Sequence, residues 1–320
     1  MLLILLLIVL MGLYLKIVLK LEIKKSDIYP NGFMISTTTT KKMSEQELRT
    51  YIRSLQDLMA KGDAQALANL KLMADKGNNH YAQAILGMMY QGGVGVKKDL
   101  AKTFEYYTAA ENYESLAQLN LGSLYEYGTY VKQDYVRAFE LYKKATDSID
   151  LNLKKIAQFN LANLFRQGLG TEQNIDMAIA LYKQTIDTAE LPKPLNPSLE
   201  ESKTGSLTAL GHLYRNKQEY DIARQYYIEA AERGNPSAAT NVSYDYLRGF
   251  GVEKNIPKAI ELFTFAAERG DPAAQNNLGT CYMDGLGVET NVQKAKQLFE
   301  LSAKQGYEIA KQNLKKLEAR

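Results

Sequence analysis

The chain has 320 residues; with 46% hydrophobic and 23% charged residues and only seven prolines, its composition excludes disorder of the whole chain. A single cysteine excludes an internal disulfide, and the two histidines, His80 and His212, match no metal-ligand spacing. Residues 1–44 carry a net charge of +4 and residues 45–320 a net charge of −1. Because nucleic-acid binding needs a concentrated basic face, a nucleic-acid partner is not expected.

Residues 1–21 are predicted to form a transmembrane anchor. The run Met1–Leu15 has no charge, and nineteen residues of helix rise about 28 Å, close to the hydrocarbon thickness of a bilayer. A signal peptide is the alternative, but no lysine or arginine precedes the apolar run and no small-residue cleavage site follows it. The lysines after the span favour a cytoplasmic repeat domain. A periplasmic location is the alternative.

Residues 22–44 have no helical period, and Pro30, Gly32 and the following threonines indicate a linker. The chain from residue 45 to residue 320 is predicted to be a helical repeat array. Its first part, residues 45–78, is interpreted as a degenerate repeat. A capping box, with Ser44 three residues before Glu47, is expected to start it.

A sequence pattern recurs six times after residue 78. The clearest copy reads Ala82-Gln83-x-x-Leu86-Gly87-x-x-Tyr90-x-x-Gly93-x-Gly95-Val96, followed by Asp99 and Ala109-Ala110. Later copies begin near Ala117, Ala157, Leu210, Tyr246 and Ala274.

This spacing predicts two antiparallel helices per copy. The leucine and tyrosine lie four residues apart on one helix face, while the glycine between them lets the partner helix approach. The Gly-x-Gly turn ends the first helix, and an Asp or Asn supplies the N-cap of the second. These predicted N-caps are Asp99, Asp134, Asn174, Asn255 and Asn291. The coarse expectation is fifteen helices and no strand.

These residues resemble the Sel-1-like repeat family, which is related to the tetratricopeptide repeats, over residues 64–320. The resemblance implies an all-α, right-handed superhelix and an adaptor role in protein complexes. An insertion at 191–205 departs from the pattern, and its three prolines predict an extended segment, either a lid or a solvent-exposed loop. The fourth copy lacks the Gly-x-Gly turn and looks like a tetratricopeptide repeat. Residues 307–319 are predicted to form the final capping helix.

No catalytic residue, metal site or cofactor is predicted. The Gly-x-Gly turns have no preceding strand and no following Gly-Lys-Ser/Thr, so they are interpreted as structural turns. His80 and His212 lack a plausible serine or cysteine partner. Cys281, inside a predicted helix, is interpreted as a small buried apolar residue. A hydrolase would require a nucleophile and base that the sequence does not pair.

The resemblance implies that the first helix of each repeat lines a concave groove. Arginines at nearly equivalent places in three successive repeats predict a clamp for a carboxylate or an acidic peptide, with asparagines and aromatic residues beside it. The alternative is that these arginines are solvated or pair with neighbouring acids. The predicted groove residues are Arg166, Arg215, Arg248, Asn163, Asn216, Tyr127 and Tyr244.

The sequence therefore predicts a membrane-tethered scaffold that binds a protein or peptide, with an acidic or carboxylate-terminated segment as the expected point of contact. A periplasmic binding or regulatory module that acts on envelope enzymes or cell-wall fragments is the alternative.

Overall fold

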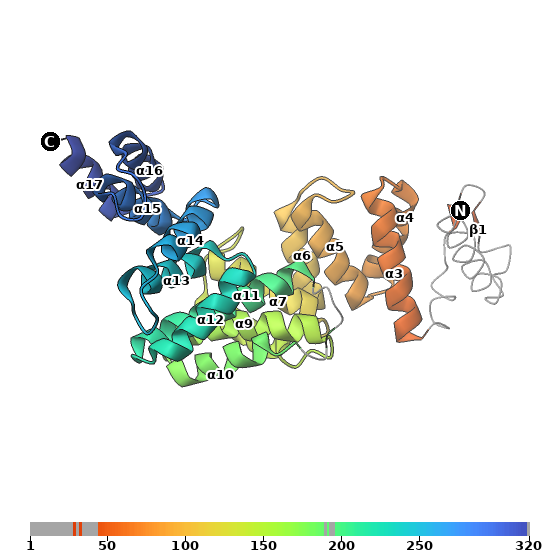
Figure 1. Cartoon of the computed structure of the whole chain (residues 1–320). Coiled ribbons are helices and arrows are strands. Elements are labelled where there is room, and N and C mark those ends of the chain that lie inside the picture. Colours follow the sequence, from red (N-terminus) through yellow and green to blue (C-terminus); the bar gives the residue numbers. More distant parts are fainter. Residues whose placement is uncertain (1–27, 30–31, 34–43, 189–190, 192–195, 319–320) are drawn as a thin grey trace, which may run out of the picture. The chain divides into compact units, whose positions relative to one another are not determined.

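The computed structural model describes residues 28–29, 32–33, 44–188, 191 and 196–318 (Figure 1). The predicted anchor, residues 1–21, lies outside the described residues, as does most of the linker. Among the helices of the described residues, none combines the length and hydropathy needed to cross a bilayer. Two short strands, β1 (Ile28–Tyr29) and β2 (Gly32–Phe33), pair antiparallel within the predicted linker. The described part of the repeat array contains no strand, as expected.

The chain divides into two units, Met1–Ala145 and Thr146–Arg320. The helices of unit 1 are α3 (Glu45–Ala60), α4 (Ala64–Lys71), the π-helix η2 (Leu72–Lys76), α5 (His80–Gly92), α6 (Leu100–Ala110), α7 (Ser115–Tyr127) and α8 (Tyr135–Ala145). The helices of unit 2 are α9 (Leu151–Gln167), α10 (Ile175–Ile186), α11 (Pro197–Asn216), α12 (Tyr220–Glu232), α13 (Pro236–Arg248), α14 (Ile256–Glu268), α15 (Pro272–Asp284), α16 (Val292–Lys304) and α17 (Glu308–Glu318).

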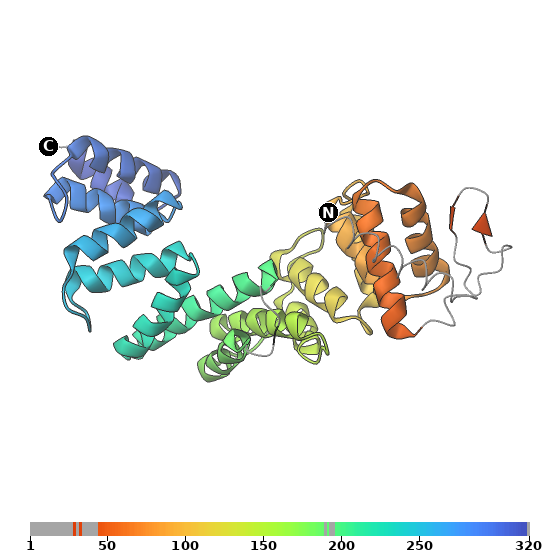
Figure 2. The same ribbon diagram turned by 45° about the vertical axis from the view of Figure 1, so that its right-hand side comes forward.

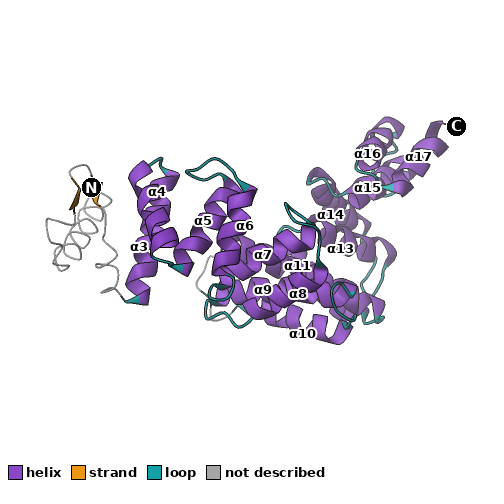
Figure 3. Cartoon of the chain, turned by 180° about the vertical axis from the view of Figure 1, so that it is seen from behind, coloured by secondary structure: helices purple, strands orange, loops and turns teal. Residues whose placement is uncertain are grey.

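Helices pack in consecutive pairs within each unit, which gives an all-helical solenoid architecture (Figure 2). In each repeat the odd-numbered helix from α5 to α15 is the first helix, and the next even-numbered helix is the second. Short loops connect the two helices, teal in Figure 3.

The helix ends follow the predicted local chemistry. Gly93 ends α5 with φ of 70°, a left-handed conformation that glycine adopts without strain. Asp99 Oδ1 then accepts a hydrogen bond from the Lys102 backbone N–H at 3.1 Å and caps α6. The other predicted N-caps accept equivalent bonds in α8, α10, α14 and α16. The predicted capping box at Ser44 is also present.

The start of α11 corrects the expectation for 191–205. Residues 197–205 are not extended but form the first turns of α11, so this part of the insertion is no lid. Asn196 Oδ1 accepts a hydrogen bond from the Leu199 N–H at 2.8 Å, and Pro197 takes the first helical position, where its missing N–H costs nothing. Leu199 and Ser206 are fully buried, so packing within unit 2 holds this helical start in place.

Candidate partner-binding face

A buried ring from each second helix packs on the first helix of the same repeat. These six rings are Tyr107, Tyr142, Tyr182, Tyr227, Phe263 and Phe299, all nearly inaccessible to solvent. A Cβ atom placed on Gly87 would lie 2.6 Å from the Tyr107 ring, and one on Gly211 would lie 2.5 Å from the Tyr227 ring. The glycine of the Leu-Gly pair therefore permits the close approach that the sequence predicts.

Each of the four tyrosine hydroxyls reaches a polar side chain on the first helix. Tyr107 Oη donates to Gln91 Oε1 at 2.8 Å, and Tyr142 Oη donates to Glu126 Oε2 at 2.6 Å. In unit 2, Tyr182 Oη donates to Asn163 Oδ1 at 2.6 Å, and Tyr227 Oη lies 2.8 Å from His212 Nδ1. These partners stand one or four residues after the small residue under the ring. The same positions carry Asn163, Arg166 and Arg215 of the predicted groove.

Two predicted arginines are held in place by this arrangement. Arg166 Nε donates to Tyr182 Oη at 3.2 Å, so Arg166 and Asn163 meet on one hydroxyl. Arg215 Nη1 donates to Asn241 Oδ1 at 2.7 Å and its Nη2 donates to Asp245 Oδ1 at 2.5 Å. Together these side chains form what we call the unit-2 polar strip: Asn163, Arg166, His212, Arg215, Asn241 and Asp245.

Electrostatic effects link the strip across α9, α11 and α13. The pKa of His212 is below its usual value, first because of burial and then because of the positive charges of Arg215 and Arg166. Burial raises the pKa of Asp245, which is only 5% exposed, while its ion pair with Arg215 works in the opposite direction. Both arginines therefore lie close enough to His212 to affect its charge state.

The remaining predicted groove residues lie in other places. Arg248, at the exposed end of α13, sits over the Tyr244 ring at 5.5 Å, and the Tyr244 ring is 5.9 Å from that of Phe250. Asn216 is exposed as the last residue of α11. Tyr127 is 70% exposed at the end of α7 and belongs to unit 1. The structure thus brings Asn163, Arg166 and Arg215 together, and the role of all seven in binding stays a prediction.

Sequence reasoning missed Tyr182, Tyr227 and Asp245 as parts of this face. The two tyrosines recur at one place in the second helix, which is a signal that the pattern offered. Asp245 precedes Arg248 by one turn, but nothing in the sequence connects it with Arg215, thirty residues away.

Other reactive side chains of the described residues have structural surroundings. Cys281 is 2% exposed, and burial raises the pKa of its thiol to about 11, so it is protonated at neutral pH. His80 stacks on Tyr113, with ring centroids 3.7 Å apart. No three His, Cys, Asp or Glu side chains of the described ranges are grouped to hold a metal ion.

Comparison with family models assigns most of these helices to repeats. The Sel1 repeat matches residues 80–112, 115–149, 155–187, 236–271 and 272–307, more than half of the chain. The tetratricopeptide repeat matches residues 206–239, which include the fourth copy. This match agrees with the absence of the Gly-x-Gly turn from that copy. No curated protein matches the chain.

One solved structure agrees with this assignment, and two others superpose poorly. A Sel1 repeat protein from Oxalobacter formigenes is 27% identical, covers 79% of this chain and 96% of its own, and superposes with a TM-score of 0.65. A protective antigen of uropathogenic Escherichia coli with an SLR fold is 25% identical, with 89% and 76% coverage and a TM-score of 0.35. An immunity protein from Pseudomonas aeruginosa is 21% identical, with 59% and 81% coverage and a TM-score of 0.34.

Five matched repeats and one well-superposed relative agree with the array of paired helices described above. The chain belongs to the Sel1 repeat family, whose fold generally serves protein–protein interaction.

Proposed function

We propose that this protein is a membrane-tethered scaffold that binds an acidic or carboxylate-terminated segment of a protein partner on the unit-2 polar strip. One observation carries the proposal. Arg166 is anchored through Nε to Tyr182, while its two terminal nitrogens have no hydrogen-bond partner among the described residues. A guanidinium group fixed at its base with donors to spare is suited to a carboxylate, since it offers parallel N–H groups.

Arg215 has a different part in this proposal. Its ion pair with Asp245 occupies Nη2, and its bond to Asn241 occupies Nη1. We therefore assign Arg215 the role of holding positive charge beside Arg166, while Arg166 makes the direct contact. Removing Arg215 would leave the carboxylate of Asp245 buried without its partner, which is costly in itself.

Arg248 and Tyr244 are proposed as a second contact point. The guanidinium of Arg248 is exposed and rests on the Tyr244 ring, which gives a partner both charge and flat apolar surface. Arginine and tyrosine are enriched among residues that dominate binding energy at protein interfaces.

A photo-crosslinking residue at the exposed Asn216 tests this function in the full chain in its native membranes. The expected result is a discrete protein adduct that is lost in Arg166→Glu and kept in Arg269→Glu. Arg269 is the matched control, because it is an exposed arginine of unit 2 at the end of α14 and undergoes the same charge change. A glutamate-rich peptide should compete for the adduct, while a lysine-rich peptide should not.

An adduct that survives Arg166→Glu would contradict binding on the strip. Thermal unfolding of each variant checks that the repeat fold is intact. An adduct with an envelope enzyme or a cell-wall fragment would favour the alternative, a periplasmic binding or regulatory module.

The tether is supported by the sequence of residues 1–21, and the lysines after this segment support a cytoplasmic repeat domain. Deletion of residues 2–21 is expected to release the protein from the membrane fraction. Protease treatment of sealed vesicles of known orientation then tests the side: digestion of the repeats only from the cytoplasmic face agrees with the proposal, and digestion only from the opposite face contradicts it.

A further inference from the structure

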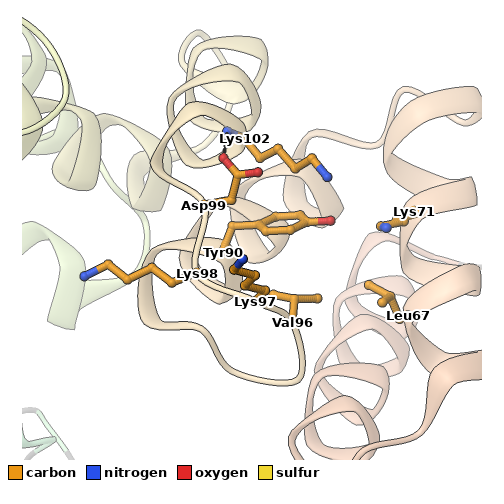
Figure 4. A pocket seen from close by; sticks show the side chains of 8 residues that line it. All are labelled: Leu67, Lys71, Tyr90, Val96, Lys97, Lys98, Asp99 and Lys102. Atoms are coloured by element: carbon orange, nitrogen blue, oxygen red, sulfur yellow. Dashed lines mark hydrogen bonds between the residues drawn. The ribbon is translucent and has the colours of Figure 1, made fainter.

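A pocket in unit 1 lies apart from the groups discussed so far. It opens between α4 and the loop that joins α5 to α6, and its volume of about 550 Å³ is in the range of small-ligand sites (Figure 4). Its lining residues are Leu67, Lys71, Tyr90, Val96, Lys97, Lys98, Asp99 and Lys102.

The fold fixes the position of this lining. A Cβ atom on Gly95 would lie 2.5 Å from the Met59 carbonyl oxygen, so the loop between α5 and α6 passes close against the end of α3. Asp99 caps α6, which places Lys102 in the first turn of that helix. Lys71 is the last residue of α4 and faces the loop from the other side.

The pocket carries an excess of positive charge. It contains four lysines and one aspartate, and Asp99 Oδ1 already accepts the Lys102 backbone N–H. Within the described part of the chain, none of the four lysines forms an ion pair. The ammonium groups of Lys71 and Lys102 lie 5.9 and 5.0 Å from the centroid of the Tyr90 ring.

Tyr90 provides a second, independent observation. The residue is 4% exposed and its ring stacks with Tyr106, while its hydroxyl is open to the pocket and has no hydrogen-bond partner among the described residues. This hydroxyl is therefore available to donate a hydrogen bond to a ligand in the pocket. In Figure 4 this hydroxyl points into the pocket, and Lys71 and Lys102 extend toward it, while Lys98 extends away from α4.

We propose that Lys71, Lys102 and the Tyr90 hydroxyl bind the phosphate group of a soluble phosphate monoester. Three donors from three directions suit a tetrahedral group, and two ammonium charges match its charge of nearly −2 at neutral pH. A planar carboxylate would instead favour the fork of an arginine, which this pocket lacks. Leu67 and Val96 supply an apolar wall for the organic part of the ligand. The site is in unit 1 and does not depend on the function proposed for unit 2.

The test is a titration of the purified full chain with phenyl phosphate, followed by the NMR signals of the Leu67 and Val96 methyl groups. Benzoate, with the same ring but a carboxylate, is titrated at equal ionic strength. We expect saturable shifts with phenyl phosphate and binding at least about tenfold weaker with benzoate, in line with the loss of one charged hydrogen bond.

Three variants identify the donors. Lys71→Ala and Lys102→Ala should each weaken phenyl phosphate binding about tenfold, and Tyr90→Phe, which keeps the ring, should weaken it about threefold. Lys98→Ala is the matched control, because it removes the same charge from the same pocket rim but its side chain extends away; its effect should be below about twofold.

Equal binding of benzoate and phenyl phosphate would overturn the assignment to phosphate. Methyl signals of Leu67 and Val96 that do not shift would overturn the site itself. If Lys98→Ala weakens phenyl phosphate binding as much as Lys102→Ala does, the binding is non-specific charge attraction. This result would also overturn the proposal.

Discussion

The six repeats from α5 to α16 share one packing arrangement but form two groups, according to whether the buried ring of the second helix carries a hydroxyl. In the four repeats from α5 to α12 the buried ring of the second helix is a tyrosine, and in the two repeats from α13 to α16 it is a phenylalanine. The residues four positions after the small residue are polar in the first group: Gln91, Glu126, Arg166 and Arg215. In the second group they are Leu247 and Met283.

The difference follows from the cost of an unpaired buried hydroxyl, about 1–3 kcal/mol. A tyrosine at this place requires a polar partner on the first helix, and the partner then lies on the outer surface of that helix. A phenylalanine has no hydroxyl that needs a hydrogen-bond partner, so the position four residues after the small residue can be apolar. The kind of ring that the second helix buries thus goes together with the polarity of the position four residues after the small residue on the first helix.

The contact between ring and small residue is common to both groups, and breaking it should have the largest effect. Gly211→Ala would place a Cβ atom 2.5 Å from the Tyr227 ring and should destabilise unit 2 by about 2–3 kcal/mol. Urea unfolding measures this change. Ala162→Gly is the control, since that repeat already accommodates a methyl group, and it should cost only the helix propensity, about 1 kcal/mol. Equal effects of the two variants would contradict the packing argument.

Converting one group into the other tests the role of the hydroxyl. Phe263 shares an apolar cluster with Tyr244 and Leu247, so Phe263→Tyr should bury an unpaired hydroxyl and cost about 1–3 kcal/mol. The double variant Phe263→Tyr/Leu247→Gln copies the pair of Tyr107 and Gln91 and should recover about 1 kcal/mol. Denaturant unfolding of the wild type, both single variants and the double variant gives the coupling energy. A coupling near zero would mean that the two positions vary independently.

Much of the fold was predictable because its signals are local. In every repeat except the fourth, an Asp or Asn before the second helix caps it through its own side chain, and a glycine after the first helix takes the left-handed conformation. The start of α11 was not predictable in this way. Proline is neutral at the first helical position, and whether a helix forms there depends on the burial of Leu199 and Ser206, which is a tertiary effect.

The candidate site was predictable along each helix but not between helices. Four-residue spacing places Arg166 and Arg215 at equivalent positions of α9 and α11, and the structure brings both to His212. The ion pair of Arg215 with Asp245 depends on how α11 and α13 pack, which spacing along one helix does not determine. The unpartnered hydroxyl of Tyr90 is likewise visible only in three dimensions.

The smallest expected effect is on the pH dependence of stability, and it concerns His212, the partner of the Tyr227 hydroxyl. His212 is the only histidine among the four hydroxyl partners, and its pKa is below the usual value of about 6.5 because of burial and the charges of Arg215 and Arg166. In the unfolded chain His212 therefore takes up a proton near pH 6.5, whereas in the folded chain it does so only at lower pH. The stability contribution of neutral His212 is fully present above that pH and is lost as the pH falls below it.

Replacing Arg166 tests this assignment directly. Arg166→Gln removes one positive charge near His212, so the pKa of His212 should rise toward its ordinary value and the acid-side loss of stability should shrink. An NMR titration of the His212 ring measures the pKa, and His80, in unit 1, serves as the internal reference. Arg248→Gln makes the same charge change beside Tyr244 and should leave the pKa of His212 nearly unchanged. If Arg166→Gln and Arg248→Gln shift the pKa of His212 equally, the shift reflects the net charge of the protein and not the position of Arg166.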